Sequence, residues 1–239
     1  MSGGRKPLVL LAASGLAREI LASVATAGRF DVVGVLDDDP RRLGAPIGST
    51  TVIGGIDDAV RHPEVQFVVC AGRGSVRAHI VDRLCALGIG ADRYASVVDR
   101  TAVVPEGCTV GSGTVVLSHV SMTADVMVGR HVVLMPQVVL THDDRIDDFA
   151  TICAGVALGG SVRVGRAAYL GMNASVRQDL QVGEQATLGM GSVLLRDLPP
   201  GRTWAGVPAR DLTTRPAPIG NDEDGPGQPV GGWEKVVVP

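Results

Sequence analysis

The sequence predicts a protein of two parts, an α/β domain followed by a β-solenoid with three faces. Aliphatic residues recur at every sixth position through the second part, and a helix would drift out of phase with such a period. The first part instead alternates buried strand-like runs with amphipathic segments, a pattern typical of a small parallel sheet flanked by helices. The boundary between the two patterns is expected at residues 97 and 98.

The bulk properties favour a globular protein that acts on small molecules. The chain has 239 residues, 45% of them hydrophobic, which is enough for one large core or two smaller ones. A net charge of −3 without a long Lys/Arg block argues against nucleic-acid and membrane-surface partners. The apolar run near the start is shorter than a signal sequence or a membrane span, so we expect a cytoplasmic protein. The four cysteines are widely spaced, which argues against a disulfide framework or a zinc site.

Residues 1–97 are predicted to form a Rossmann-like α/β domain. Strands and helices are expected, in chain order, in LVLLAA, SGLAREILASVATAG, DVVGVLDDD, VQFVVCAGRGS and SVRAHIVDRLCALGI. Ligands of parallel sheets bind at the carboxyl ends of the strands, which here are Ala12 to Gly15, Asp37 to Asp39, and Ala71 to Gly74. The first loop lacks a complete G-x-G-x-x-G, so it supports a dinucleotide site only weakly. Ser14 and Gly15 open a helix, whose N–H groups suit a phosphate, although ordinary capping explains them as well.

Residues 98–212 are predicted to form the solenoid and its closing segment. Every sixth residue from Val98 to Leu194 is aliphatic or Met, seventeen in succession, which chance would produce in roughly one trial per million. Three faces give coils of 18 residues, or about 5.7 coils in all. Glycines follow the aliphatic residue at seven positions, where we expect corners that need a positive φ: 111, 129, 159, 165, 171, 183 and 189. Residues 213–239 form a tail rich in Pro, Gly and acid, expected to be mobile or to strap across a neighbour.

The segment LTHDDRIDDF, residues 140–149, interrupts the aliphatic pattern with charge. Leu140 and Ile146 keep the inward column, so His142 and Asp143 fall on outward positions that are available for chemistry. Residues 18 apart stack on neighbouring coils, which places His142 between Ala124 and Gly160. Two small neighbours leave open surface beside the imidazole, although a turn sequence alone would also explain Gly160.

Asp144 falls on an inward position of the same segment. A buried carboxylate without partners would cost several kcal/mol. We therefore expect one of three compensations: a local bend of the strand, a hydrogen-bond network with Arg145 or His142, or a register displaced over one hexad.

Several stretches together resemble one family of hexapeptide-repeat acyltransferases. They are AASG, VLDDD, CAGRG, the coils containing THDD, and the closing GVPAR, and they span residues 7–212. The family is that of the sialic acid O-acetyltransferases and the bacillosamine-type sugar N-acetyltransferases. The resemblance implies a left-handed parallel β-helix that binds acetyl-CoA between the subunits of a homotrimer. It also implies that the first domain binds the nucleotide of a nucleotide-linked amino sugar.

The resemblance further assigns roles to individual residues. His142 matches the catalytic histidine, Asp143 the acid that follows it, and Gly160 a glycine near the acetyl group. The substrate-binding positions are Ser14, Gly15, Asp37, Asp38, Gly72, Arg73 and Thr151. The acetyl-CoA positions are Met172, Ala174 and Met190 for pantetheine, and Trp204 and Arg210 for adenine and the phosphates. For Trp204, a plain cap of the solenoid is an equally good interpretation. Two positions depart from the family, because Leu16 and Thr151 stand where it has histidines.

The chemistry of acyl transfer explains why a histidine beside a carboxylate is suited to this position. An amine that attacks a thioester must lose a proton, and imidazole, with an ordinary pKa of about 6.5, accepts it near neutral pH. A neighbouring carboxylate fixes the tautomer and stabilises the imidazolium. The sequence therefore predicts an acetyl-CoA-dependent N-acetyltransferase of a nucleotide-linked amino sugar, and no metal.

Two alternative functions are compatible with the same residues. The same base would serve O-acetylation of a sugar hydroxyl, and the departures at Leu16 and Thr151 would also suit a non-catalytic scaffold that binds nucleotide sugars. A zinc carbonic anhydrase on the same kind of solenoid is disfavoured, because His119, His131 and His142 lack its spacing.

Overall fold

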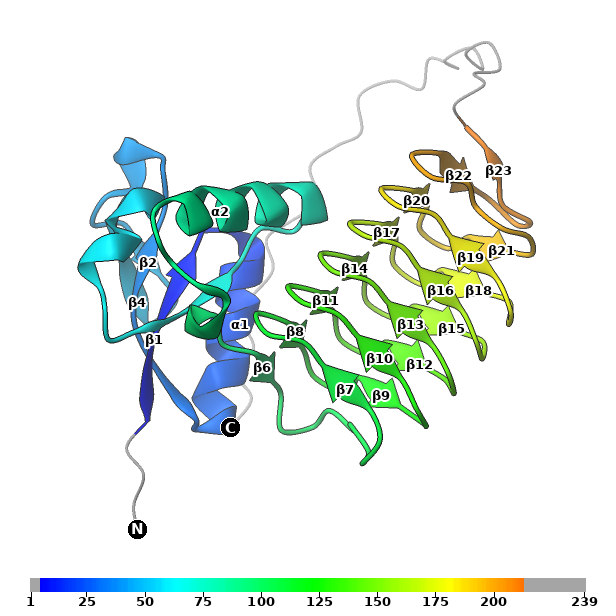
Figure 1. Cartoon of the computed structure of the whole chain (residues 1–239), viewed down its shortest axis with the longest axis horizontal. Coiled ribbons are helices and arrows are strands. Elements are labelled where there is room, and N and C mark those ends of the chain that lie inside the picture. Colours follow the sequence, from blue (N-terminus) through cyan, green and yellow to red (C-terminus); the bar gives the residue numbers. More distant parts are fainter. Residues whose placement is uncertain (1–4, 213–239) are drawn as a thin grey trace, which may run out of the picture.

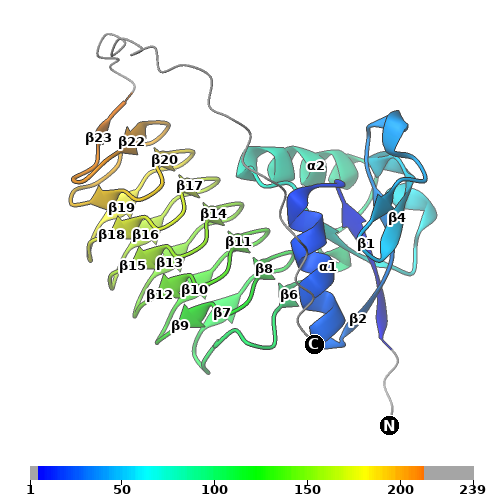
Figure 2. The same cartoon turned by 180° about the vertical axis from the view of Figure 1, so that it is seen from behind.

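The computed structural model describes residues 5–212, which form an α/β domain packed against one side of a β-solenoid (Figures 1 and 2). The α/β domain stands beside the first coils, and the chain then winds away from it toward the cap formed by its last described residues. This architecture confirms the predicted fold class. The predicted tail, residues 213–239, lies outside the described residues.

The α/β domain is built on a five-stranded sheet of order β3-β4-β2-β1-β5. All neighbours run parallel except β3 and β4. The strands are β1 (Lys6–Leu11), β2 (Phe30–Leu36), β3 (Pro46–Ile47), β4 (Thr50–Gly54) and β5 (Gln66–Val69). Three short 3₁₀ helices complete the connections: η1 (Pro40–Arg42), η2 (Ile56–Arg61) and η3 (Ala91–Arg93).

Helices α1 (Gly15–Ala27) and α2 (Gly74–Ala86) pack with separate apolar clusters of this domain. The cluster around α1 joins Leu8 and Ile20 to Val115 and Val133 of the solenoid. The cluster around α2 joins Leu11 and Phe67 to helix residues such as Ile80. Since the first cluster contains residues of both parts, the α/β domain and the solenoid share an apolar contact.

The solenoid is a stack of short strands that forms three faces of parallel strands, which we call faces I, II and III. After β6 (Val97–Val98), the chain passes through them in the repeating order I, II, III. Face I contains β7 (Thr109–Val110), β10 (Met127–Val128), β13 (Arg145–Ile146), β16 (Arg163–Val164) and β19 (Gln181–Val182). Face II contains β6 (Val97–Val98), β8 (Val115–Val116), β11 (Val133–Leu134), β14 (Thr151–Ile152), β17 (Tyr169–Leu170), β20 (Thr187–Leu188), β22 (Thr203–Ala205) and the antiparallel β23 (Arg210–Asp211). Face III contains β9 (Ser121–Met122), β12 (Val139–Leu140), β15 (Ala157–Leu158), β18 (Ser175–Val176) and β21 (Val193–Leu194).

The six-residue register is confirmed by burial. Every aliphatic position from Val116 to Leu194 lies in one continuous core, and the three earlier positions pack partly against it. Strands pair with strands 18 residues away, as Met127 with Arg145 and Arg145 with Arg163. The coil therefore has 18 residues and three faces, as predicted.

The prediction about the corner glycines was wrong. Positive φ occurs at the fourth position of every hexad from Gly107 to Gly191, as at His119 and Asp143, and not at the glycines of the second position. Those glycines are needed for close stacking, because a Cβ at Gly111 or Gly165 would lie 2.6 Å from the backbone of the next coil. Glycine thus allows neighbouring coils to approach, and the left-handed corners are formed mainly by other residues.

Two negative findings hold within residues 5–212. No helix there is long and apolar enough to cross a membrane. The four cysteines in this part of the chain are all free, with Cys70 and Cys153 buried and Cys85 exposed on α2.

Candidate active site

His142 stands on the corner between faces III and I, where β12 ends and β13 has not yet begun. Its side chain is 65% exposed, and its Nδ1 atom lies 2.8 Å from Oδ2 of Asp143. This hydrogen bond raises the pKa of His142 above its ordinary value. The carboxylate accepts the proton of Nδ1 in the neutral ring, which leaves the lone pair on Nε2. The imidazole is therefore held on an open surface in a tautomer that can accept a proton at Nε2.

The predicted stacking of this corner is confirmed. The amide of Asp143 donates to the carbonyl of Ala124 at 3.0 Å, and the amide of Ser161 donates to the carbonyl of His142 at 2.9 Å. A Cβ placed on Gly160 would overlap the Cε1 and Nε2 atoms of His142. The absence of a side chain at residue 160 is thus required for this position of the ring, beyond any role in the turn.

Asp144 is fully buried, as its inward position predicts, but its compensation comes from the backbone. Its two carboxylate oxygens accept from the amides of Thr141 at 2.8 Å and Val162 at 2.9 Å. The expected network with Arg145 or His142 and the expected register shift are both wrong, because the following strands keep their pairing. The reason is proximity, since these two amides point directly at the carboxylate.

The bonds of Asp144 change the ladder next to His142. Strands β12 and β15 pair only through Val139 and Ala157, whereas neighbouring strand pairs of face III are joined by two residue pairs. The amide of Thr141 donates to the carboxylate of Asp144, and the hydroxyl of Thr141 donates to the carbonyl of Leu158 at 3.1 Å. Asp144 therefore shapes the corner that carries the histidine.

A shallow hollow of about 550 Å³ lies on face I beside this corner. Asp143 lines it together with Arg145 and Arg163, which are stacked in register on β13 and β16. Two stacked cations next to the base suit the phosphates of a ligand. Arg145 and Arg163 were not among the predicted site residues, although their spacing of 18 residues would have placed them together.

The three strand ends of the α/β domain meet as predicted. The carboxylate of Asp37 accepts from the amide of Ala13 at 2.7 Å, and the hydroxyl of Ser14 donates to the carbonyl of Cys70 at 2.5 Å. Ser14 also caps α1 through the amide of Ala17. Gly15 has open space beside it, so this edge of the sheet can accept a ligand.

Asp38 turns away from this point. Its carboxylate accepts from Arg83 of α2 at 2.6 Å and from the amide of Ile56 at 3.0 Å. Arg83 also pairs with Asp57, so the side chain of Asp38 is engaged within the domain while remaining half exposed.

A cleft of about 630 Å³ opens between the start of α2 and the solenoid. Gly72, Arg73, Gly74 and Ser75 form one wall, and residues of β17, β20 and their corners form the other: Ala167, Tyr169, Gln185 and Thr187. Within residues 5–212, no acidic side chain lines it. Of the predicted substrate residues, Gly72 and Arg73 are thus in a cleft that can hold an anionic molecule.

Three predicted ligand residues are buried instead. Thr151 is 2% exposed, and its hydroxyl donates to the carbonyl of Gly72 at 2.9 Å where α2 packs on face II. Ala174 is fully buried because it occupies the inward fifth position of its hexad. Trp204 is 6% exposed and closes the end of the core, with the guanidinium of Arg196 4.8 Å from its ring centroid. Thr151 therefore belongs to the domain contact, and Trp204 is a solenoid cap.

The remaining predicted acetyl-CoA residues are exposed. Met172 and Met190 are stacked on the corner between faces II and III, where the amide of Gly191 donates to the carbonyl of Met172 at 2.7 Å. Arg210 is exposed on β23 at the cap. Leu16, the other departure from the family, is buried in the core around α1.

The two halves of the candidate site lie on different sides of the solenoid. The α/β domain packs on face II and its corners, through contacts such as Arg77 to the carbonyls of His131 and Phe149. His142 occupies the corner between faces III and I, which is opposite face II in the triangular cross-section. Within one chain, the base and the cleft at Gly72 are therefore separated by the core.

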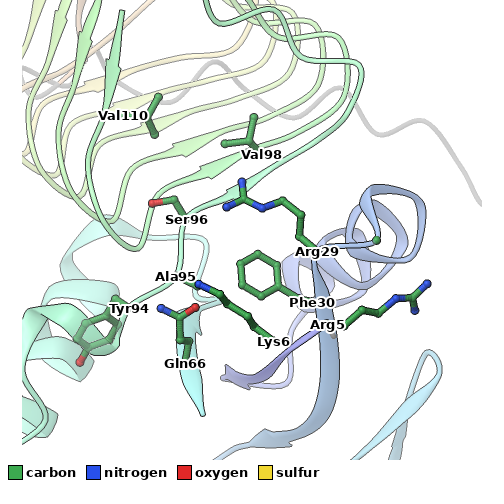
Figure 3. Close-up of a pocket in the computed structure, with 11 residues that line it drawn as sticks. Arg5, Lys6, Arg29, Phe30, Gln66, Tyr94, Ala95, Ser96, Val98 and Val110 are labelled. Atoms are coloured by element: carbon green, nitrogen blue, oxygen red, sulfur yellow. The ribbon is translucent and has the colours of Figure 1, made fainter. Parts of the chain in front are cut away.

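A further hollow of about 550 Å³ lies at the amino ends of β1 and β2, beside the first coil (Figure 3). Lys6 and Arg29 line it, and Arg29 extends toward Val98 and Ser96 of the solenoid. It is far from Ser14 and Asp37, because those residues follow the carboxyl ends of the strands and this hollow lies at the amino ends. Among residues 5–212, no three His, Cys, Asp or Glu side chains are grouped so as to hold a metal ion.

The chain joins a solenoid of hexapeptide coils to an α/β domain, and its similar proteins of known structure are acetyltransferases. Comparisons with known proteins are specific within this class. Residues 7–84 match the model of the PglD N-terminal domain. A segment of 56 residues is 32% identical to the UDP-N-acetylbacillosamine N-acetyltransferase of Bacillus subtilis (strain 168), covering 23% of this chain and 24% of that protein.

Two solved structures match nearly the whole chain. The acetyltransferase domain of PglB from Neisseria gonorrhoeae FA1090 is 27% identical with a TM-score of 0.79, covering 87% of this chain and 100% of that one. PerB from Caulobacter crescentus, solved with CoA and GDP-perosamine, is 27% identical with a TM-score of 0.77, covering 88% and 98%. The chain is therefore similar to nucleotide-amino-sugar acetyltransferases of known structure over nearly its whole length, and to the PglD N-terminal domain over residues 7–84.

Proposed function

We propose that the protein transfers the acetyl group of acetyl-CoA to the amino group of a nucleotide-linked amino sugar. The observation that carries the proposal is the pair of His142 and Asp143, held at 2.8 Å on an open corner against a glycine. The relatives support the substrate classes, since PerB was solved with CoA and GDP-perosamine and the PglB domain with acetyl coenzyme A.

His142 acts as the general base. The neutral amine attacks the thioester carbonyl, and Nε2 accepts the proton that the nitrogen loses as the tetrahedral intermediate forms. Asp143 holds Nδ1–H and stabilises the imidazolium. When the intermediate collapses, the carbon–sulfur bond breaks, and the imidazolium returns the proton to the departing thiolate. Atoms and charges balance without a covalent enzyme intermediate.

The working form is a homotrimer in which each site uses two subunits. His142 is separated from the cleft of its own chain by the solenoid core, so the cleft of a neighbouring chain must approach it. Cyclic symmetry repeats such a contact identically around the axis. The nucleotide sugar then lies between Gly72 and Arg73 of one chain and the corner of His142 on the next.

The test is acetyl transfer with a panel of nucleotide-linked amino sugars and their hydroxyl counterparts, followed by CoA release. We expect release with an amine, and a loss of roughly 10²–10⁴-fold in His142→Ala, the usual contribution of a general base. His119→Ala is the matched control, because His119 is another exposed corner histidine. Equal rates in the parent and His142→Ala would refute the base. Transfer to a hydroxyl alone would indicate an O-acetyltransferase, and no transfer to any acceptor would indicate a scaffold.

A further inference from the structure

Arg77 is a fully buried cation at the contact between the two parts of the chain. Its side chain is 1% exposed, yet it extends from α2 onto two successive coils of the solenoid. The guanidinium donates to six acceptors at 2.7–3.0 Å: the carbonyls of Ala71, Gly72, His131, Phe149 and Ala150, and the hydroxyl of Thr151.

No carboxylate pairs with Arg77 among residues 5–212, and all of its acceptors there are neutral. Burial lowers its pKa to about 10, so it stays protonated at neutral pH. Buried charges are normally paired, because desolvation is costly. The described chain therefore surrounds this positive charge with neutral hydrogen-bond acceptors alone.

This charge lies directly behind the loop that forms one wall of the cleft. Two of its bonds hold the carbonyls of Ala71 and Gly72. On the other side of that loop, Gly72 to Ser75 line the cleft, where α2 begins without a side-chain cap. A cation, the positive end of the helix dipole and a lining without acids all favour an anion at this place.

A steric contact fixes the same wall independently. A Cβ on Gly74 would overlap the carbonyl oxygen of Phe149 and lie 3.1 Å from Cα of Ala167. The start of α2 is thus pressed onto the corner between faces I and II. Its distance from the solenoid is set by both the guanidinium bonds and the missing side chain.

We propose that Arg77 is a positioning residue for the diphosphate of the nucleotide sugar. It fixes the loop of Gly72 and Arg73 on the solenoid, and its buried charge is balanced when a diphosphate occupies the cleft. The ligand's identity rests on the proposed function, whereas the preference for a diphosphate follows from the charge and the lining.

The test compares the binding of GDP, UDP and dTDP with that of the matching nucleosides, by calorimetry on the full chain. Arg77→Gln is expected to weaken diphosphate binding by about 10–100-fold while changing nucleoside binding by less than about twofold. Arg77→Lys keeps the charge but loses the planar guanidinium with its several donors, so it should retain part of the diphosphate affinity. Equal losses for diphosphate and nucleoside, or no loss, would overturn the proposal.

Two further variants keep the experiment decisive. Arg93→Gln is the matched control, because Arg93 also bonds only backbone carbonyls, those of His62 and Val65, but within the α/β domain. If circular dichroism shows that Arg77→Gln does not fold, Gly74→Ala tests the positioning of the loop instead. This variant retains every charge, and the proposal requires that it still weaken diphosphate binding. A parent that binds diphosphates but transfers no acetyl group would refute the proposed function alone. A parent that binds no nucleoside diphosphate would refute the role of Arg77.

Discussion

In the proposed mechanism, the hydrogen bond between His142 and Asp143 determines how acetyl transfer depends on pH. The base must be neutral, so activity falls as the pH drops through the pKa of His142. Because Asp143 raises that pKa, Asp143→Asn should move the acid limb of kcat/KM to lower pH and reduce the plateau by at least about tenfold, since the ring loses its orienter. The amine of the substrate titrates identically in both enzymes and cancels in the comparison.

Asp125→Asn is the control for this pH profile. Asp125 is exposed at the same fourth hexad position one coil earlier, also with positive φ. Its substitution should leave the acid limb in place. An unchanged limb in Asp143→Asn would show that the carboxylate does not tune the base.

Gly160 and Gly165 separate an effect on the reaction from an effect on the fold. Alanine at residue 160 would displace the exposed imidazole, so we expect kcat to fall by about tenfold or more with little change in Tm. Alanine at residue 165 would meet the amide nitrogen of Glu184 at 2.6 Å, so it should lower Tm. Steady-state kinetics and thermal unfolding of both variants provide the test. A normal kcat in Gly160→Ala would contradict the stacking of the base on this residue.

At the scale of the element, Asp144 shapes the end of β12. The unfolding free energy of the protein should depend on pH through this residue. Burial raises the pKa of Asp144 to about 6, above the ordinary value of 3.8. A carboxyl with a raised pKa in the folded state favours folding when protonated. This contribution is fully present below about pH 4 and is lost as the pH rises through 6.

The variant Asp144→Asn isolates this contribution. The parent should lose about 2 kcal/mol of unfolding free energy relative to the variant between pH 4 and pH 7, from a shift of about two pKa units. Any fixed packing cost of the amide displaces the whole curve without changing its slope. Denaturant unfolding across this pH range gives the two curves, and parallel curves would contradict a raised pKa.

The elements of the solenoid could be predicted because six-residue periodicity records which side chains point inward. The same register would have predicted that Ala174 is buried, because it occupies the inward fifth position of its hexad. It also placed Asp144 correctly in the core. It could not identify the acceptors of the Asp144 carboxylate, because those depend on the path of the backbone over a few ångströms. The left-handed fourth position was also missed, since Asp, His and Gln occupy it as readily as glycine.

At the scale of the whole molecule, the sequence placed His142 on an exposed corner but did not predict the arrangement of the two parts. Periodicity reports directions relative to one coil and says nothing about which face another domain covers. Thr151 therefore resembled a ligand position, although α2 covers it, and Arg77 carried no local signal at all. Because the α/β domain is placed on face II, the cleft and His142 lie on opposite sides of the solenoid.

The central claim is that the histidine of one subunit acts on a sugar held by the next, and mixed trimers test it directly. His142→Ala removes the base, whereas Gly72→Trp fills the cleft from a position with open space for a side chain. Each variant alone should be nearly inactive. After unfolding and refolding together in equal amounts, random trimers should place an intact base beside an intact cleft in about one site of four, restoring about a quarter of the parental rate of CoA release. A mixture that stays as inactive as its two components would contradict the shared site.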